Sequence, residues 1–194
     1  MHKELIDHIN NHIKSPLKNA QTELVKKAFV SKKIRKKQYF LQEGEVCKHF
    51  AFIVKGAMRQ YSVDDKGAEH VVGLFIENWW AGDRESFVML TPSVYNIDAW
   101  EDTEALVMTR ADQVALFNSV PSLSELSLRL DERHAFANQK RLNDLVSLTA
   151  EKRYVHFTES HPEFLKRFPQ HVIASYLGIT KETLSRLRAQ MTKK

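Results

Sequence analysis

The chain has 194 residues, of which 43% are hydrophobic and 27% charged, and it carries a formal net charge of +5. Such a composition predicts a folded protein with room for one large domain or two small ones. The single cysteine, Cys47, excludes a disulfide within the chain and any multi-cysteine metal or iron–sulfur site. The polar N-terminus lacks a signal peptide's apolar core, and no run of about 18 apolar residues occurs. We therefore expect a cytoplasmic protein without a membrane partner.

Within the first part of the chain, residues 1–118, the spacing of the apolar residues changes once, from a helical pattern to a β-strand pattern. Up to about residue 29 the apolar residues recur at helical spacing on both sides of Pro16. From Ile34 to Arg110, short β-rich runs alternate with turn signals such as Asp65-Lys66-Gly67. Close spacing of such runs is typical of an antiparallel roll or barrel. The pattern predicts an α+β fold with N-terminal helices and a jelly-roll-like β-roll.

A long helix is predicted over residues 119–148, with Ser119 or Ser122 as its N-cap. Its apolar residues recur at near-heptad spacing. This stripe is equally compatible with packing on its own domain and with pairing two copies of the chain as a homodimer. The residues assigned to this stripe at its N-terminal end are Leu123, Leu126, Leu130 and Ala137.

The last part, residues 149–194, contains the whole charge excess, with nine Lys/Arg against four Asp/Glu. This asymmetry predicts a polyanionic partner for the C-terminal end. A helix is expected at about 150–158, followed by two short helices across a tight turn within 170–188. Ala174 suits the point where the two helices cross, Gly178 suits a turn with positive φ, and Thr180 can cap the second helix.

The outer face of that second helix has side chains suited to base edges and phosphates. We predict a helix-turn-helix that binds double-stranded DNA; the alternative is a ligand-binding or scaffold module whose helix pair engages protein. The predicted DNA-binding residues are Gln170, His171, Thr180, Lys181, Glu182, Thr183, Ser185, Arg186 and Arg188.

A β-roll, one long helix and a helix-turn-helix, in this order, resemble the Crp/Fnr family of bacterial transcription regulators. The resemblance covers nearly the whole chain. Glycine-punctuated segments of the roll match the family pattern at Glu43-Gly44-Glu45 and Ala81-Gly82-Asp83, and the DNA-reading helix matches at Lys181-Glu182-Thr183 and Arg186. The resemblance implies that Glu182 and Arg186 read bases, with Lys181 assisting. It also implies a homodimer on a pseudo-palindromic operator and leaves RNA polymerase open as a partner.

The resemblance also implies an effector pocket beside a short helix of the roll. Relatives that bind cyclic AMP have Gly-Glu there and a later Arg-Ser/Thr pair that clamps the phosphate. Here Gly82-Asp83 replaces the first pair and Tyr95-Asn96-Ile97 replaces the second, which argues against cyclic AMP and leaves another small effector open. Arg84 either approaches an anion from another side or is solvated. The candidate pocket residues are Gly82, Asp83, Arg84, Glu85, Ser86, Tyr95 and Asn96.

The sequence ends at Lys194, without the family's usual β-hairpin wing. We expect fewer phosphate contacts as a result, unless Lys193 and Lys194 act as a basic end.

Enzyme motifs are absent from the sequence, which has no G-x-S-x-G, P-loop or G-x-G-x-x-G. His49 and His70 do not form the H-x-H pair that a metal-dependent β-roll enzyme would need. We therefore predict no catalytic residues and no metal site, and the sequence identifies no cofactor with certainty. Trp79, Trp80 and Trp100 either line an apolar pocket or belong to the core.

Overall fold

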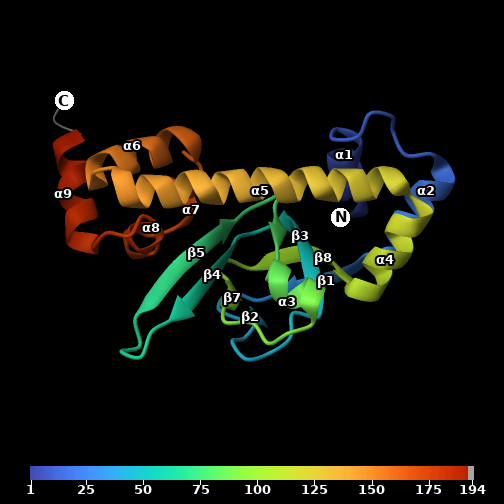
Figure 1. Ribbon diagram of the computed structural model, residues 1–194, viewed down its shortest axis with the longest axis horizontal. Coiled ribbons are helices and arrows are strands. Elements are labelled where there is room, and N and C mark those ends of the chain that lie inside the picture. The colour runs from blue at the N-terminus through green and yellow to red at the C-terminus, as the bar shows by residue number, and fades with distance from the viewer. Residues whose placement is uncertain (192–194) are drawn as a thin grey trace.

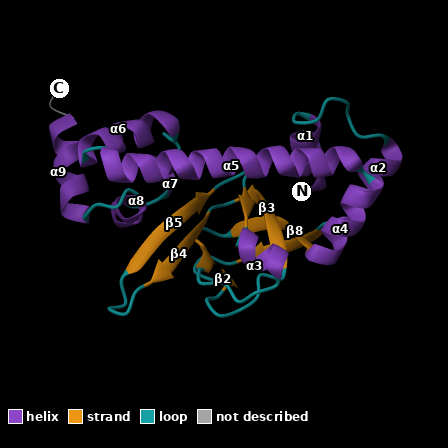
Figure 2. Cartoon of the chain, in the orientation of Figure 1, coloured by secondary structure: helices purple, strands orange, loops and turns teal. Residues whose placement is uncertain are grey.

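A computed structural model describes residues 1–191 of the chain (Figures 1 and 2). The N-terminal helices α1 (His2–Asn10) and α2 (Asn19–Ala28) lie on either side of Pro16. Phe29 is extended, and β1 (Val30–Ile34) follows at once, although we expected strands only from Ile34. The early start has a tertiary cause, because Val30 through Ile34 pair antiparallel with Val107 through Thr103.

The β-roll consists of two four-stranded antiparallel sheets with the strand orders β1-β8-β3-β6 and β2-β7-β4-β5. Apolar side chains from both sheets form the core between them, among them the fully buried Ile53, Met58 and Ile97. The short helix α3 (Arg84–Met89) follows β6 at the edge of the first sheet (Figure 1). The strands are β2 (Tyr39–Leu41), β3 (His49–Lys55), β4 (Met58–Val63), β5 (Glu69–Phe75), β6 (Trp80–Ala81), β7 (Asn96–Ala99) and β8 (Thr103–Thr109).

Two helices, rather than one, follow the roll. α4 (Arg110–Ser119) begins with a reciprocal cap between Thr109 and Asp112, which our sequence analysis missed. The long helix α5 (Pro121–Ser147) then begins at Val120, so neither Ser119 nor Ser122 caps it and that prediction was wrong. Pro121 provides the start instead, because its fixed φ suits the first helical position, where no N–H donor is needed.

The C-terminal helices are α6 (Ala150–Ser160), α7 (Phe164–Arg167), α8 (Gln170–Tyr176) and α9 (Lys181–Met191). They gather at the C-terminal end of α5, while α1, α2 and α4 gather at its N-terminal end (Figure 1). A continuous apolar cluster joins these helices to the roll, since Phe164 and Ile173 share it with Tyr61 and Leu74. Across residues 1–191, no helix has the length and apolar character needed to cross a membrane.

Candidate nucleic-acid interface and effector cavity

The predicted tight turn joins α8 to α9. Gly178 has φ +63°, and the N–H of Ile179 donates to the carbonyl of Ala174 at 3.0 Å. Ala174 is buried, as a helix crossing requires. The Thr180 hydroxyl accepts from the backbone N–H of Thr183 at 3.2 Å and so caps α9. These local predictions of turn, crossing and cap are confirmed.

Helix α9 has one buried face and one exposed face. Leu184 and Leu187 are 1% and 7% exposed and pack into the apolar cluster of the C-terminal helices. The face turned to solvent brings together most of the side chains that the sequence predicted for DNA, and we name it the α9 outer face. Its exposed members are Lys181, Glu182, Ser185, Arg186 and Arg188, while Thr180 beside it is exposed and Thr183 half-buried.

Glu182 lies in the first turn of α9. Its own backbone N–H and the Thr180 hydroxyl bond to the carboxylate and hold the pKa of Glu182 below its usual value. The carboxylate is therefore ionised at neutral pH and can accept a hydrogen bond from an amino group.

The roll holds the helix pair in place through α8. The Ser175 hydroxyl accepts from the N–H of Val71 and donates to the carbonyl of Glu69, both at 2.9 Å. The guanidinium of Arg141, on α5, donates to the carbonyls of Val71 at 3.1 Å and Tyr176 at 2.9 Å. α9 therefore projects from a base that is tied to both the roll and α5.

Two other predicted DNA contacts are placed differently. The ring of His171 lies edge-on to Trp100 of the roll, with the centroids 5.9 Å apart, so it is engaged with the roll in this conformation. Gln170 is half-buried at the start of α8. The suggested basic end, Lys193 and Lys194, lies outside the described residues.

The predicted effector residues around α3 serve the fold. The buried carboxylate of Asp83 caps α3 by accepting from the N–H groups of Glu85 and Ser86, and it also accepts from the Ser93 hydroxyl at 2.7 Å. The Ser86 hydroxyl accepts from the N–H of Cys47 at 2.8 Å and donates to a carbonyl.

The other predicted members do not assemble into an anion site either. Arg84 forms an ion pair with Asp131 of α5. Asn96 accepts from the backbone N–H of Glu43 at 3.1 Å, while Glu85 is exposed and Tyr95 is half-buried. The polar groups of Asp83, Arg84 and Ser86 are paired within the protein, and the predicted pocket around α3 stays a prediction. Gly82 and Arg84 line a larger cavity on the side of α5, which the other predicted members do not line.

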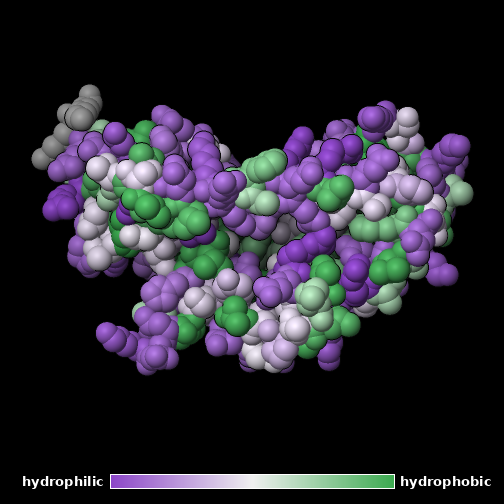
Figure 3. All heavy atoms as spheres, viewed as in Figure 1, coloured by the Kyte–Doolittle hydropathy of each residue, from purple (hydrophilic) through white to green (hydrophobic). Residues whose placement is uncertain are grey.

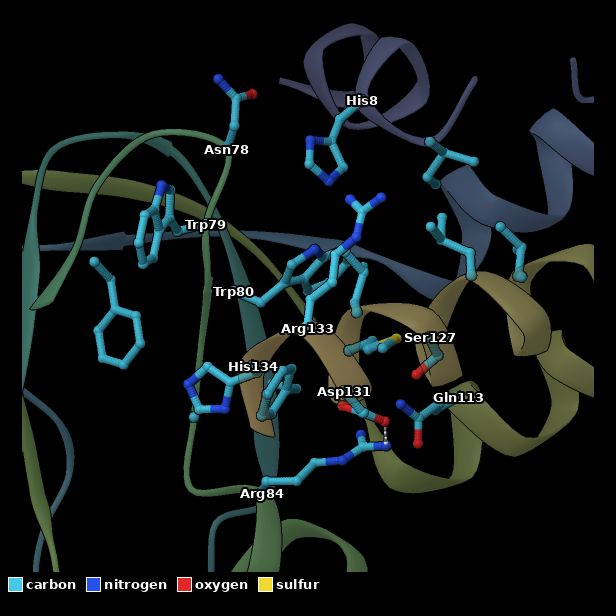
Figure 4. A pocket seen from close by; sticks show the side chains of 18 of the residues that line it. His8, Asn78, Trp79, Trp80, Arg84, Gln113, Ser127, Asp131, Arg133 and His134 are labelled. Atoms are coloured by element: carbon cyan, nitrogen blue, oxygen red, sulfur yellow. Dashed lines mark hydrogen bonds and ion pairs between the residues drawn. The ribbon is translucent and has the colours of Figure 1, made fainter. Parts of the chain in front are cut away.

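This cavity, of about 490 Å³, lies between α5 and the roll and extends toward α1 and α4 (Figure 4). Its walls are mainly apolar, with Phe29, Leu116, Leu123 and Trp80 among them. Both open interpretations of the tryptophans hold in part: Trp79 and Trp80 line the cavity, whereas Trp100 packs against the core of the C-terminal helices.

The cavity also contains a few polar groups that our sequence analysis missed. These are His8 from α1, Gln60 from β4, Asn78 before β6, Gln113 from α4, and Ser127, Asp131, Arg133 and His134 from α5. Burial lowers the pKa of His8 to about 4, and burial also lowers the pKa of His134, so both rings are neutral at pH 7. No spacing signal could have revealed this set, because it combines residues far apart in the sequence.

Comparison with known proteins agrees with this architecture. Residues 31–119 match the family model described as a cyclic nucleotide-binding domain. Over 175 residues the chain is 24% identical to electron transport regulator A of Shewanella oneidensis, covering 84% of this chain and 68% of that protein. Over 184 residues it is 23% identical to the transcriptional activator protein Anr of Pseudomonas protegens, covering 87% and 72%. In these relatives and in the order of its parts, the chain is similar to regulators of the Crp/Fnr family.

Solved structures share the fold of this chain. FixK2 from Bradyrhizobium japonicum superposes with a TM-score of 0.74 at 20% identity and 85% coverage of both chains. The catabolite activator protein of Thermus thermophilus gives 0.60 at 19% identity, with 96% of this chain and 87% of that one covered. Of these similar proteins, Anr is named as a transcriptional activator. The groups of metal-ligating residues that an ion would need do not occur within residues 1–191.

The predicted dimer residues lie on the inner side of the long helix, and their role in pairing two copies stays a prediction. Leu123 and Leu126 are buried against the roll and the N-terminal helices, and Leu130 packs against the same cluster. Ala137 is exposed but lines the cavity. Near-heptad spacing did not separate the inner from the outer side of α5, because both sides have leucines.

A different set of apolar side chains on α5 faces solvent, and we name it the outer stripe. Apolar side chains interrupt the mainly hydrophilic surface over α5 in Figure 3. The members of the outer stripe are Leu128, Phe136, Leu142 and Val146, with 62%, 66%, 62% and 82% exposure.

Proposed function

We propose that this protein is a dimeric, cytoplasmic regulator of Crp/Fnr type that binds a specific DNA sequence through the α9 outer face. The observation that carries the proposal is the exposure of Lys181, Glu182 and Arg186 together on a helix whose other face is buried. A helix in this arrangement fits the major groove, because its charged side chains can reach base edges without unpacking the domain.

The residue chemistry assigns separate roles. The Arg186 guanidinium can donate two hydrogen bonds to a guanine, and the ionised Glu182 can accept from a cytosine amino group. Lys181 and Ser185 are suited to phosphate or base contacts beside them. Thr180 and Thr183 are already bonded to each other, so we assign them to orienting the start of α9.

The outer stripe of α5 supports the dimer. Four large apolar side chains on one exposed helix surface are costly in water, and a second copy of the same helix would cover them. Two copies related by a twofold axis would place two α9 helices roughly 34 Å apart, one turn of DNA, on a pseudo-palindromic operator. RNA polymerase then becomes a candidate neighbour at a promoter.

Cyclic AMP does not fit the residues around α3. The arginine that would clamp a cyclic phosphate has no counterpart at Tyr95-Asn96, and the Asp83 carboxylate is committed to capping. We propose that this regulator responds to another small molecule or to none.

Binding to duplex DNA tests the proposal directly. We expect fluorescence anisotropy with labelled genomic fragments to show binding whose affinity falls steeply as salt is added, because counterions are released from the phosphates. Binding that is absent or insensitive to salt would favour the alternative, a module whose helix pair engages protein.

The role of Arg186 has its own prediction. We expect Arg186→Ala to cost about 1–3 kcal/mol in binding to a selected operator and to relax the preference at one base position. Lys33→Ala is the control, because it removes the same charge from an exposed site on the roll. An equal loss on every sequence would assign Arg186 to phosphate.

A further inference from the structure

We propose that the cavity beneath α5 binds an amphipathic anion, namely a carboxylate carried on an apolar body. Its role as an effector rests on the proposed function; its binding does not. The site differs from the predicted pocket, since Asp83, Ser86, Tyr95 and Asn96 do not line it.

The walls explain the apolar body. Residues from the helices α1, α3, α4 and α5 and from strands of both sheets line this space, and a volume of about 490 Å³ is within the usual range for small-molecule sites. Phe29, Leu116, Leu123, Leu126 and Trp80 surround the interior. An aliphatic or aromatic group of moderate size would bury its surface against them, which is the main source of affinity in such sites.

The charge balance favours an anionic head group. At the mouth of the cavity, Arg84 is paired with Asp131, so these two charges cancel. His8 and His134 are neutral at pH 7 because burial lowers the pKa of each. Arg133 remains: across residues 1–191 its guanidinium has neither an ion pair nor a hydrogen bond, and it extends toward His8 and Trp80 in Figure 4. The polar end of the cavity therefore carries one unneutralised positive charge.

Two polar atoms near this charge lack partners. Within the part of the chain that the structure describes, Nε2 of His8 and the indole Nε1 of Trp80 are buried without any hydrogen bond. Leaving such a group unpaired is unfavourable, because its lost hydrogen bonds to water are not replaced. A carboxylate that pairs with Arg133 can accept from the Trp80 N–H and from a protonated Nε2 of His8 after a small adjustment of these side chains. Three converging donors are typical of a carboxylate site.

A path leads from the cavity to the DNA-binding helices. Trp79, on the cavity wall, packs against Phe164 of α7, with the ring centroids 5.5 Å apart, and lies 5.9 Å from the ring of His161. Glu77, two residues earlier, binds Arg167 of α7 at 2.9 Å. A ligand that moves the segment from Glu77 to Trp80 would act on α7, and hence on the base that supports α9.

Calorimetry and tryptophan fluorescence on the full, DNA-free protein test the site. The probes are decanoate and phenylbutyrate, each compared with its neutral amide at concentrations below micelle formation. We expect at least one acid to bind the wild-type protein with about tenfold or greater preference over its amide, because only the acid forms a charge-assisted hydrogen bond. Failure of both acids to bind at millimolar concentration, or equal binding of acid and amide, would overturn the proposal.

Matched variants locate the head group. Arg133→Gln should weaken the bound acid about tenfold and leave the amide nearly unchanged. Lys140→Gln is the control, since Lys140 is an exposed cation on α5 outside the cavity. Trp80→Phe keeps an aromatic wall but removes the N–H, so it should weaken the acid more than the amide. Equal affinities for Arg133→Gln and Lys140→Gln would refute the assignment of the head group.

The two proposals can fail separately. An acid that binds a protein without DNA affinity would refute the proposed function and support the site. DNA binding by a protein with no affinity for either acid would refute the site and support the proposed function.

Discussion

The start of α3 and the α9 outer face both match family motifs, but they use their polar side chains in opposite ways. At α3, Asp83 and Ser86 are buried and fully engaged in hydrogen bonds within the protein. On α9, Lys181 and Arg186 project into solvent. A motif therefore predicts a binding role only where the fold leaves the hydrogen-bonding capacity of its residues unused.

Burial explains this difference. A buried carboxylate must be satisfied internally, so Asp83 takes the donors nearest to it, which are the first N–H groups of α3. The same residue types at the surface of α9 have water as a partner and can exchange it for DNA. The cavity is an intermediate case, because Nε2 of His8 and Nε1 of Trp80 are buried but have no hydrogen bond within the described residues.

The contrast between engaged and unengaged side chains also applies to the outer stripe of α5, where the exposed groups are apolar. The largest effect is expected there. We expect Leu142→Glu to convert a dimer to a monomer and to lower affinity for a palindromic operator about 100-fold or more, since two linked half-sites bind far better than one. Analytical ultracentrifugation and anisotropy measure the two effects. Lys140→Glu introduces the same residue on another side of α5 and should leave both unchanged. A Leu142→Glu protein that remains dimeric would show that copies pair elsewhere.

A substitution at α3 tests whether Asp83 is structural. We expect Asp83→Ala to lower the free energy of unfolding by about 2 kcal/mol, because a helix cap and a charged hydrogen bond are lost together. Asp83→Asn retains an acceptor and should cost less. Urea unfolding measures both. If Asp83→Ala unfolds like the wild type yet loses ligand binding, Asp83 has a binding role, and the proposed difference between α3 and α9 is wrong.

The turn before α9 offers the smallest of these effects. Gly178→Ala should cost about 1 kcal/mol of stability, since an alanine at φ +63° is strained and its Cβ would lie 2.9 Å from Leu145. Gly67→Ala is matched, with φ +80° but no atom within 4 Å of the added Cβ. A larger cost at Gly178 than at Gly67 assigns the difference to contact with α5. Equal costs would leave backbone strain as the whole cause.

Sequence reasoning worked where the signal is local. The crossing at Ala174, the turn at Gly178 and the cap at Thr180 each depend on neighbours within a few residues, and all three are present. The α+β fold was also predicted correctly. The DNA contacts and the three-part division of the chain stay predictions.

Sequence reasoning was limited where tertiary contacts decide the outcome. Val30 joins a strand because β8 pairs with it, and Leu126 is buried because the roll and N-terminal helices cover it. Helix α4 had a local signal, the pair of Thr109 and Asp112, which was overlooked. The cavity had none, since His8, Trp80 and Arg133 meet only after α1 and α5 pack on the roll.

The central claim is that Arg186 on the α9 outer face reads a guanine in the major groove, and methylation interference tests it most directly. Methylation of guanine N7 prevents the guanidinium of an arginine from donating its paired hydrogen bonds to that guanine, and it leaves the phosphates unchanged. We predict that one methylated guanine in each half-site prevents binding of the wild-type protein and that Arg186→Ala is insensitive to the same methyl group. Unimpaired wild-type binding to every methylated guanine, or equal interference in both proteins, would contradict the account.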